Sequence, residues 1–292
     1  MIVRGRLTFL CFIVITVTFS QTEIISISGS DQSIQLEFIK GGAVTIANQE
    51  IQIPEFYIGA YEITYDQYKL FQSREYDTDD SQLENYNADA VTRPTPTYED
   101  YTKGMGKEGG YPAVSMTQQA AVRYCQWLYQ KTGLFFRLPT EAEWQYACIQ
   151  GQTKKEPLEN TTWNFQNSYE TYHQAGQKMP NELGLYDMFG NVAEWTSDQF
   201  TEDYHVDTSL WVIPTRRHSR TVKGGSYLSD PEECTCTYRE RSNPRWQMRD
   251  PQIPKSEWWN TDAPFLGFRV LMPAQQPLKH EIEAYFQKAI VY

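Results

Sequence analysis

The pattern of apolar and polar positions predicts few regular elements in the first third of the chain. In the sequence QLEFIKGGAVTI at 35–46, apolar and polar residues alternate on both sides of two glycines. This pattern predicts two paired strands joined by a turn. Residues 51–64 predict a strand that leads into a helix start, with Thr64 as N-cap and Gln67 completing a capping box. The polar stretch 73–111, rich in Asp, Asn, Pro and Gly, predicts a long excursion with little regular structure.

Helical periodicity is clearest between residues 115 and 133. Ser115 or Thr117 can cap the N-terminus of this helix, and Gly133 is suited to end it. Apolar residues recur along one side and predict its buried face, namely Ala120, Ala121, Tyr124, Cys125 and Leu128. Cys125 is therefore expected in the core.

A shorter helix is predicted at 139–149. Thr140 can cap it, Glu143 follows at the spacing of a capping box, and Cys148 lies on its apolar side. Turns dominate after residue 150, and the next helical pattern is the C-terminal sequence KHEIEAYFQKAIVY. Few elements and many turns predict a single α+β domain with long irregular loops.

The first twenty residues have the pattern of a secretion signal. Arg4 and Arg6 precede a short apolar run, and Ser20 offers a cleavage point. The run is too short to span a bilayer comfortably. We therefore expect an exported protein, periplasmic or at the cell surface or secreted, and not an integral membrane protein.

After the signal peptide, the chain is expected to form one domain with a short extension at each end. The predicted divisions are a signal peptide at 1–20, an N-terminal segment at 21–34, the domain at 35–273 and a helical tail at 274–292. The formal net charge of −11 argues against nucleic acid and anionic membranes as partners.

The cysteines raise the chemical question. Four remain after the signal, and an exported location favours at least one disulfide. Cys234 and Cys236 stand one residue apart in EECTCTYRER, and side chains at i and i+2 of an extended segment point to the same side. From the residues alone, the pair could be reactive thiols, soft-metal ligands or part of a disulfide. No zinc-type Cys/His spacing is present, and the four histidines are scattered.

The acidic cluster YDTDDS at 76–81 lacks a glycine hinge and a distal Glu, so we interpret it as a solvated turn rather than a calcium loop.

Several segments, in order, resemble the formylglycine-generating enzyme / sulfatase-modifying-factor family. They are FYIGAYEITYDQY (56–68), RLPTEAEWQYAC (137–148), GLYDMFGNVAEWTSD (184–198), VKGGSY (222–227) and the closing LGFRV (266–270). The resemblance covers most of 35–272 and implies a C-type-lectin-like α+β domain of low regular content. Within these segments, Arg137 and Arg269 are expected to tie loops together through carboxylates, and Trp144 to lie in the core.

The resemblance also implies a calcium site. The positions that the family uses fall on Asp187, Gly190, Val192 and Glu194, the middle two through their carbonyls, which is a set of hard oxygen ligands. The alternative is a tight turn whose acids cap nearby amides. Of the family's second calcium site, only Asn164 survives, so a second ion is not expected.

Active members of the family bind copper(I) through two cysteines that follow the GGS segment, and they oxidise a substrate cysteine with oxygen. Such chemistry needs soft sulfur ligands. Counted forward from GGSY, the two positions fall on Ser229 and Cys234. Counted backward from the closing segments, both fall on other residues before Cys234. Neither count supplies both copper ligands. The tryptophan that family members carry before the calcium-site glutamate is Ala193 here, whereas Ser226 matches.

The backward count places Cys236 on a family cysteine whose disulfide partner corresponds to Cys148. The implied bridge Cys148–Cys236 would contribute about 4 kcal/mol in the chain-entropy model. Cys125 is then expected as a buried free thiol, and Cys234 as a free thiol or a weak metal ligand.

Two hypotheses follow for the function. The first is a non-catalytic, calcium-binding part of a bacterial envelope, secretion or gliding-type assembly, with a protein or glycan partner. The excursion 73–111 and the loop 228–264, which contains Trp246, Trp258 and Trp259, would form its contact surface, unless these rings pack against the domain's own loops. The alternative is a copper-dependent formylglycine-generating oxidase that acts on sulfatase cysteines through Cys234, Cys236 and Ser226.

Overall fold

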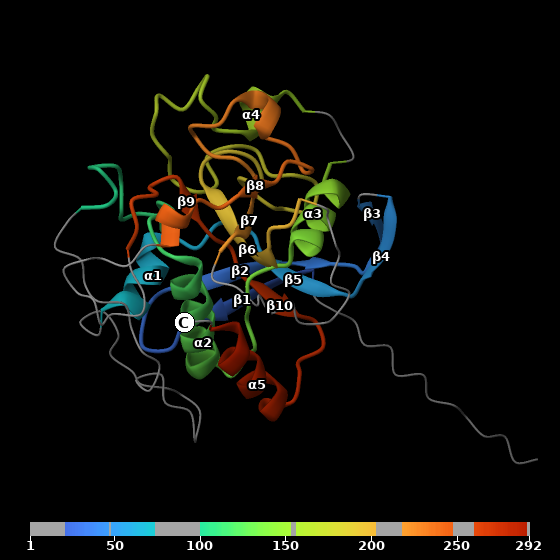
Figure 1. Ribbon diagram of the computed structural model, residues 1–292. Coiled ribbons are helices and arrows are strands. Elements are labelled where there is room, and N and C mark those ends of the chain that lie inside the picture. Colours follow the sequence, from blue (N-terminus) through green and yellow to red (C-terminus); the bar gives the residue numbers. More distant parts are fainter. Residues whose placement is uncertain are drawn as a thin grey trace, which may run out of the picture.

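The computed structural model describes residues 21–46, 48–73, 100–152, 156–202, 218–247 and 260–290 (Figure 1). The expected signal peptide, the acidic cluster at 76–81, Trp258 and Trp259 lie outside these residues, as does most of the excursion 73–111. Within the described ranges, no helix combines the length and apolar character that crossing a bilayer requires.

An antiparallel sheet of order β1-β2-β5-β10 contains strands from near both ends of the described chain, at its two opposite edges. Its strands are β1 (Thr22–Ser26), β2 (Ser33–Ile39), β5 (Phe56–Gly59) and β10 (Leu271–Pro273). In β5, Ile58 is paired with both Glu37 of β2 and Leu271 of β10, and all four residues of the strand are buried. The sequence analysis does not predict β1, which lies within the segment 21–34 and pairs along its whole length with β2.

The strand pair predicted at 35–46 is wrong in its pairing. Strands do form on both sides of the glycines, but β2 pairs with β1 and β5, while β3 (Gly42–Ile46) pairs with β4 (Gln49–Ile53) in a separate hairpin. Gly41 is not a hairpin turn. A Cβ there would lie 2.7 Å from the carbonyl oxygen of Ile53, so the glycine allows a close backbone approach as the chain leaves the sheet.

A second sheet of order β8-β7-β6-β9 carries the residues of the candidate site. Its strands are β6 (Ala193–Gln199), β7 (Arg220–Lys223), β8 (Glu240–Arg241) and β9 (Leu266–Gly267). Strand β6 runs antiparallel to β7 and parallel to β9, so the segments 193–199 and 266–267 lie side by side. Glu194 of β6 is paired with Lys223 of β7 and Gly267 of β9, which fixes its position in the interior.

The predicted helices form, and their caps are those expected from the sequence. The helices are α1 (Tyr65–Gln72), α2 (Gln118–Thr132), α3 (Glu141–Gln150), the single turn α4 (Leu158–Thr161) and the C-terminal α5 (Lys279–Ala289). Thr64 and Gln67 form a complete capping box on α1, as do Thr140 and Glu143 on α3. Of the two cap candidates for α2, Thr117 makes the bond, and Gly133 ends the helix at φ 73°.

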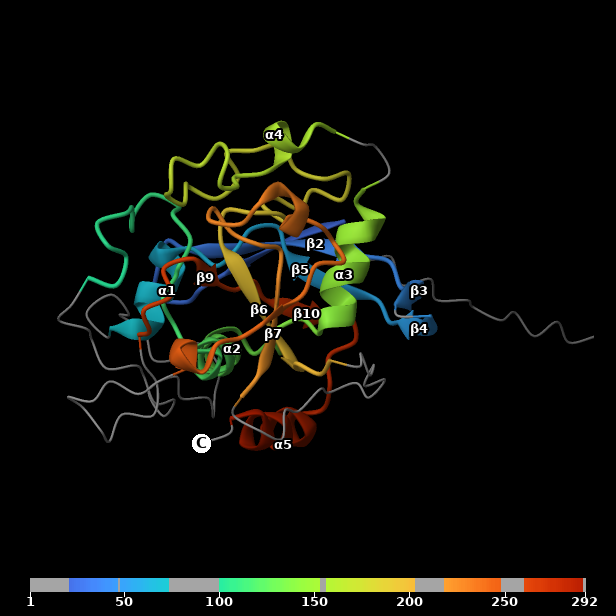
Figure 2. The ribbon, with the colours of Figure 1, turned by 45° about the horizontal axis from the view of Figure 1, so that its top comes forward.

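The helices pack on the sheets through aromatic rings. The predicted stripe of α2 is wholly buried, and Tyr124 in it contacts Tyr68, Phe71 and Phe268 at ring distances of 5.5–5.9 Å. Helix α5 packs Tyr285 and Phe286 against Phe135. Figure 2 shows α3 at the other side of the molecule, beside the β3–β4 hairpin.

Candidate functional site

A buried arginine organises the calcium-type loop. The Arg269 Nε donates to both oxygens of Glu194 at 2.8 and 2.7 Å, and its Nη2 donates to Oε1 at 2.6 Å. The remaining guanidinium hydrogens reach the carbonyls of Gly59 and Tyr186 at 3.0 Å. The Trp144 indole donates to Glu194 Oε2 at 2.8 Å. Arg269 thus connects β5, β6 and the loop before it, and Trp144 lies in the core, as the sequence predicts.

Two further carboxylates share this interior. Asp187 and Glu62 are 2% and 1% exposed, and each leaves one oxygen, Oδ1 and Oε2, without a hydrogen-bond partner in the described part of the chain. Their other oxygens accept from the Gly176 amide at 2.6 Å and the Asn191 side chain at 3.1 Å. Three buried acids therefore surround one buried arginine, which is an excess of two negative charges among the buried groups when all are ionised. The half-buried Lys178 offsets part of this excess at Asp187.

Burial, with a smaller contribution from neighbouring acids, raises the pKa of both carboxyls. Burial raises the pKa of Asp187 to about 6, against the opposing effects of the Gly176 amide and Arg269. Burial, and then the charge of Asp187, raise the pKa of Glu62 well above its ordinary value. Glu62 is the residue that sequence reasoning missed. Its one signal is a lone acid inside the apolar and aromatic run YIGAYEITY.

The donor set fits a calcium ion. A dication would neutralise the two excess charges, and the two unpartnered oxygens are the hard ligands that calcium prefers. Gly190 has φ 68°, and a Cβ there would lie 1.9 Å from the Trp163 carbonyl oxygen, so the loop requires glycine. No group of three His, Cys, Asp or Glu side chains in the described ranges is arranged to hold a metal unaided, so backbone carbonyls such as those of Gly190 and Val192 would have to contribute.

Asn164, the one residue that matches the family's second calcium site, is used in a local turn. The Asn164 side-chain oxygen accepts from the Gln166 amide at 2.9 Å, and the Asn164 amide donates to Asn167 Oδ1 at 2.9 Å. These bonds hold a turn in the loop after α4, and they commit the one surviving family residue to that turn.

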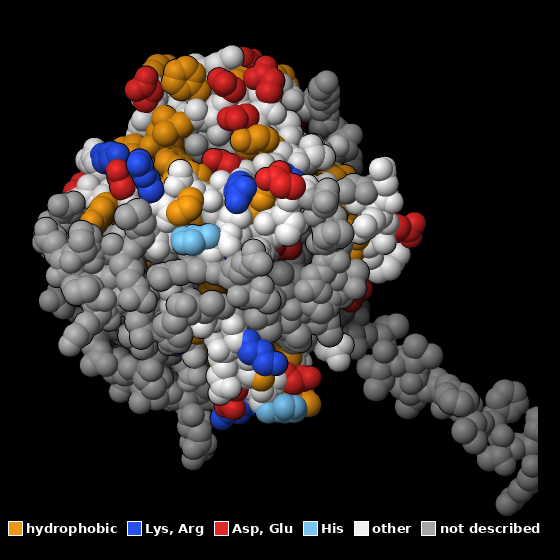
Figure 3. Space-filling model, in the orientation of Figure 1, with side chains coloured by type: hydrophobic (Ala, Val, Ile, Leu, Met, Phe, Trp, Pro, Cys, Tyr) orange, Lys and Arg blue, Asp and Glu red, His pale blue; other side chains and the backbone are white. Residues whose placement is uncertain are grey.

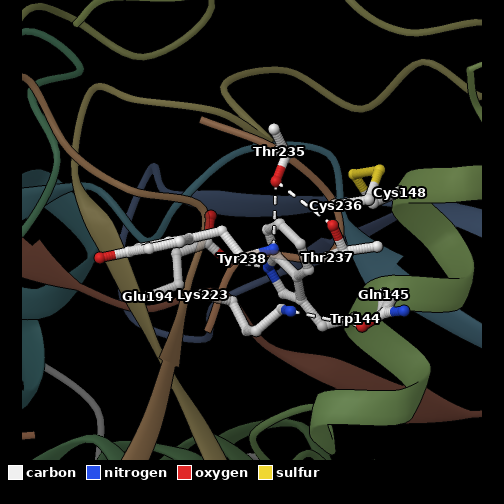
Figure 4. The surroundings of a disulfide bond; sticks show 9 residues. All are labelled: Trp144, Gln145, Cys148, Glu194, Lys223, Thr235, Cys236, Thr237 and Tyr238. Atoms are coloured by element: carbon white, nitrogen blue, oxygen red, sulfur yellow. Dashed lines mark hydrogen bonds between the residues drawn. A yellow bond between two sulfur atoms is a disulfide. The ribbon is translucent and has the colours of Figure 1, made fainter. Parts of the chain in front are cut away.

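The structure joins Cys148 of α3 to Cys236 in a disulfide, the pairing that the family resemblance implies (Figure 4). The bond closes a separation of 88 residues and ties α3 to the segment that follows the glycines of VKGGSY. Cys125 and Cys234 are free and buried. Burial raises the pKa of both thiols, that of Cys234 to about 12, with further increases from the charges of Glu233, Asp230 and Glu232.

Cys234 lies close to the other position that the forward count selects. A Cβ built on Gly225 would lie 3.3 Å from both the Cys234 sulfur and the Ser229 Cβ, so these two residues flank the same glycine. The Ser229 hydroxyl accepts from the Ser226 amide at 3.1 Å, and the Ser226 hydroxyl accepts from the Leu228 amide at 3.2 Å. The two positions that the forward count selects therefore bring one thiol and one hydroxyl to the same glycine.

A cavity of about 880 Å³ lies beside these cysteines. Its wall includes Cys148, Cys234, the turn α4 and the loop 179–189, with Leu185, Met188 and Phe189 among its apolar residues. Asp187 also borders it, which places the candidate calcium loop and the thiol on one cavity.

Other expected residues have structural roles. Arg137 forms a two-pronged pair with Glu143 at 2.7 Å for both contacts and donates to the Leu138 carbonyl, within one segment of chain. Ala193 is buried in the core. Trp246 packs edge-on against Trp195 and Phe265, so this ring covers the domain's own core and is not the exposed anchor considered above.

Comparisons with known proteins show the family to which the chain belongs. Residues 16–251 match the family model described as the sulfatase-modifying factor enzyme 1-like domain, and the chain belongs to that family. It is 32% identical over 157 residues to a formylglycine-generating enzyme of Mycobacterium tuberculosis, covering 44% of this chain and 50% of that protein. It is 28% identical over 207 residues to the serine/threonine-protein kinase Pkn1 of Chlamydia trachomatis, covering 66% of this chain and 32% of the kinase. The chain thus spans about a third to a half of the length of these relatives.

Solved structures show the same fold. The Treponema denticola variable protein 1 superposes with a TM-score of 0.61 at 20% identity, over 87% of this chain and 100% of that one. PvdO from Pseudomonas aeruginosa superposes with a TM-score of 0.62 at 18% identity, over 88% and 100%. The predicted formylglycine-generating-enzyme-like α+β domain is confirmed.

Proposed function

We propose that this chain is an exported, non-catalytic member of the sulfatase-modifying-factor family that serves as a binding or structural component of a bacterial envelope, secretion or gliding-type assembly. One observation carries the proposal: Cys236 is in a disulfide with Cys148, and Ser229 stands beside the remaining thiol, Cys234. A copper(I) centre needs two thiolates, and a hydroxyl is a poor ligand for so soft an ion. Burial and neighbouring acids also keep the Cys234 thiol protonated.

The competing function is a copper-dependent oxidase. Cys234 and Cys236 could form a thiol pair near Ser226 only if the disulfide opened, and opening it would release the tie between α3 and the segment after residue 234. The 32% identity to a formylglycine-generating enzyme keeps this alternative worth testing.

The test is to count thiols and to look for turnover. Under denaturing, non-reducing conditions the mature protein should show two free thiols, Cys125 and Cys234. With copper(I) and oxygen it should leave a sulfatase-derived cysteine peptide unconverted. Conversion that disappears in Cys234→Ser would establish the oxidase instead. Ser229→Cys is the matched gain-of-site variant, and it should retain one copper(I) per chain that the wild type releases to a chelator.

We also propose that calcium is a structural ion here, held by Asp187 and Glu194 with the carbonyls of Gly190 and Val192, and that Glu62 adds its unpartnered oxygen to this set. The buried carboxylate excess supports this assignment, and Arg269 would share Glu194 with the ion. Export is proposed from the N-terminal sequence. The protein recovered from a secreting bacterium should lack residues 1–20, and an intact mass that includes them would contradict this.

A further inference from the structure

Two loops carry three exposed apolar side chains on one face of the molecule. Phe165, Tyr169 and Leu228 are 52%, 88% and 44% exposed. We define the loop surface as residues 158–172 and 226–236. At the top of the view in Figure 3, where these loops lie, hydrophobic and acidic side chains stand next to each other.

Hydrogen bonds hold the two loops together. The Phe165 amide donates to the Ser229 carbonyl at 3.0 Å, and the buried Ser168 hydroxyl donates to the Tyr227 carbonyl at 2.8 Å. Tyr169 is held in the left-handed region at φ 59°, a conformation that few residues other than glycine adopt. The apolar side chains are therefore presented from a fixed backbone, which lowers the entropy that a partner would have to remove.

The charge of the loop surface has one sign. Its two segments contain five acids and no lysine or arginine. Four of these acids are exposed and take part in no ion pair among the described residues: Glu159, Glu170, Asp230 and Glu232. A cation borders the surface: Lys178 lies over the Trp163 ring at 3.9 Å and donates to the Glu159 carbonyl. His173 stacks on the same ring at 3.8 Å.

We propose that the loop surface docks a protein segment in which lysine or arginine flanks an apolar side chain. Apolar anchors supply the binding energy of such contacts, and the unpaired acids around them select a basic partner and speed its association. Anionic membranes and nucleic acids would be repelled. The loop surface includes Ser229, one of the two positions that a copper site would need. This inference therefore rests on the proposed non-catalytic role, and it states which class of partner that role would involve.

The probe is a displayed library of random short peptides, selected on the mature wild-type protein. Selected sequences should be enriched in Lys or Arg beside Leu, Phe or Trp. Synthetic versions, measured by fluorescence anisotropy, should bind at least about tenfold more weakly to Phe165→Ser and to Tyr169→Asn. Asparagine tolerates the left-handed backbone, so this second variant keeps the loop folded. Glu170→Lys combined with Glu232→Lys should weaken binding several-fold and flatten its salt dependence.

Matched controls lie on other elements. Ile24→Ser removes a side chain that is 65% exposed on β1, and Glu50→Lys reverses an exposed acid on β4, and neither should change the affinity. Selected peptides without basic enrichment, or equal affinity for wild type and the loop variants, would overturn the proposal. So would an oligosaccharide that binds the wild type and not Tyr169→Asn while the peptides do not. Thiol counts and copper retention report on Cys234 independently, so failure here is distinguishable from failure of the non-catalytic role.

Discussion

Two buried Arg–Glu pairs in this domain have equally short contacts and different surroundings. Arg137 and Glu143 meet through two bonds of 2.7 Å, and Thr140 supplies further donors to the carboxylate. Arg269 and Glu194 meet as closely, but Asp187 and Glu62 stand in the same interior with unpartnered oxygens. The first pair holds a helix start, and the further acid whose charge acts on it, Asp198, is only half-buried and accepts from the Glu141 amide. The second carries surplus charge, which a structural role alone does not require and a bound cation would explain.

Replacing each arginine in turn should give the largest difference in stability between the two pairs. Arg269→Met leaves three buried acids without a cation, whereas Arg137→Met leaves one. Breaking a buried pair costs about 3–5 kcal/mol, and we expect Arg269→Met at or above the top of this range and Arg137→Met near the bottom. The measurement is denaturant unfolding in the presence of a calcium chelator. Equal losses would show that Asp187 and Glu62 do not depend on Arg269.

Double variants that remove both members of a pair test the same difference in surroundings. Arg137→Met with Glu143→Gln removes a self-contained pair, and its stability should recover to within about 1–2 kcal/mol of the wild type. Arg269→Met with Glu194→Gln should not recover as far, because Asp187 and Glu62 still lack their cation. Full recovery at both sites would argue that the two pairs are equivalent.

Calcium should act on one of the two pairs only. At a free concentration of a hundred times its dissociation constant, an ion that binds the folded state alone adds about 2.7 kcal/mol, so the melting temperature should rise. Asp187→Asn should abolish the rise. Asp198→Asn is the matched control, because Asp198 is a half-buried acid whose pKa is also raised by burial, but it accepts from the Glu141 amide at the start of α3. An unchanged melting temperature in the wild type, or a rise that persists in Asp187→Asn, would end the calcium proposal.

The two pairs also show what sequence can predict. The Arg137–Glu143 pair lies within residues 137–143. Local signals predict the helix and its Thr140–Glu143 capping box, but Arg137 was expected to tie separate loops together, and it instead pairs with the capping-box glutamate of its own segment. The caps of α1 and α2 were predictable for the same reason. The strand pairing at 35–46 was not, because the partners of β2 come from segments on either side of the hairpin, and Gly41 looks like a turn when only its neighbours are known.

The unbalanced cluster combines residues that are far apart in sequence. Asp187 and Glu194 fall in one recognisable motif, but Glu62 lies more than a hundred residues earlier and enters the site only through the fold. Its burial, and so its charge state, depends on contacts that no local pattern encodes. The loop surface has the same origin, since the hydrogen bond between Phe165 and Ser229 joins two segments that show no relation in the sequence.

The dependence of stability on pH should have opposite signs at the two pairs. Arg137 and its hydrogen bonds hold the pKa of Glu143 below its ordinary value, despite burial, so this acid stabilises the fold above its unfolded pKa, and the contribution is lost as pH falls through the folded one. Burial raises the pKa of Glu62, so its contribution is present below the unfolded pKa and is lost as pH rises toward the folded one.

Glu62→Gln isolates the second effect. Glutamine keeps an oxygen for the Asn191 side chain, which donates to Glu62 Oε1 at 3.1 Å, and it carries no charge at any pH. Without calcium, we expect this variant to be more stable than the wild type at pH 8 and almost unchanged at pH 4, because the buried carboxylate is charged in the folded protein only at the higher pH. Glu143→Gln should show the reverse, with its largest loss at pH 8. If Glu62→Gln is destabilising at pH 8 in chelator, then the Glu62 carboxylate is compensated in the folded protein, and the surplus charge that distinguishes the two pairs does not exist.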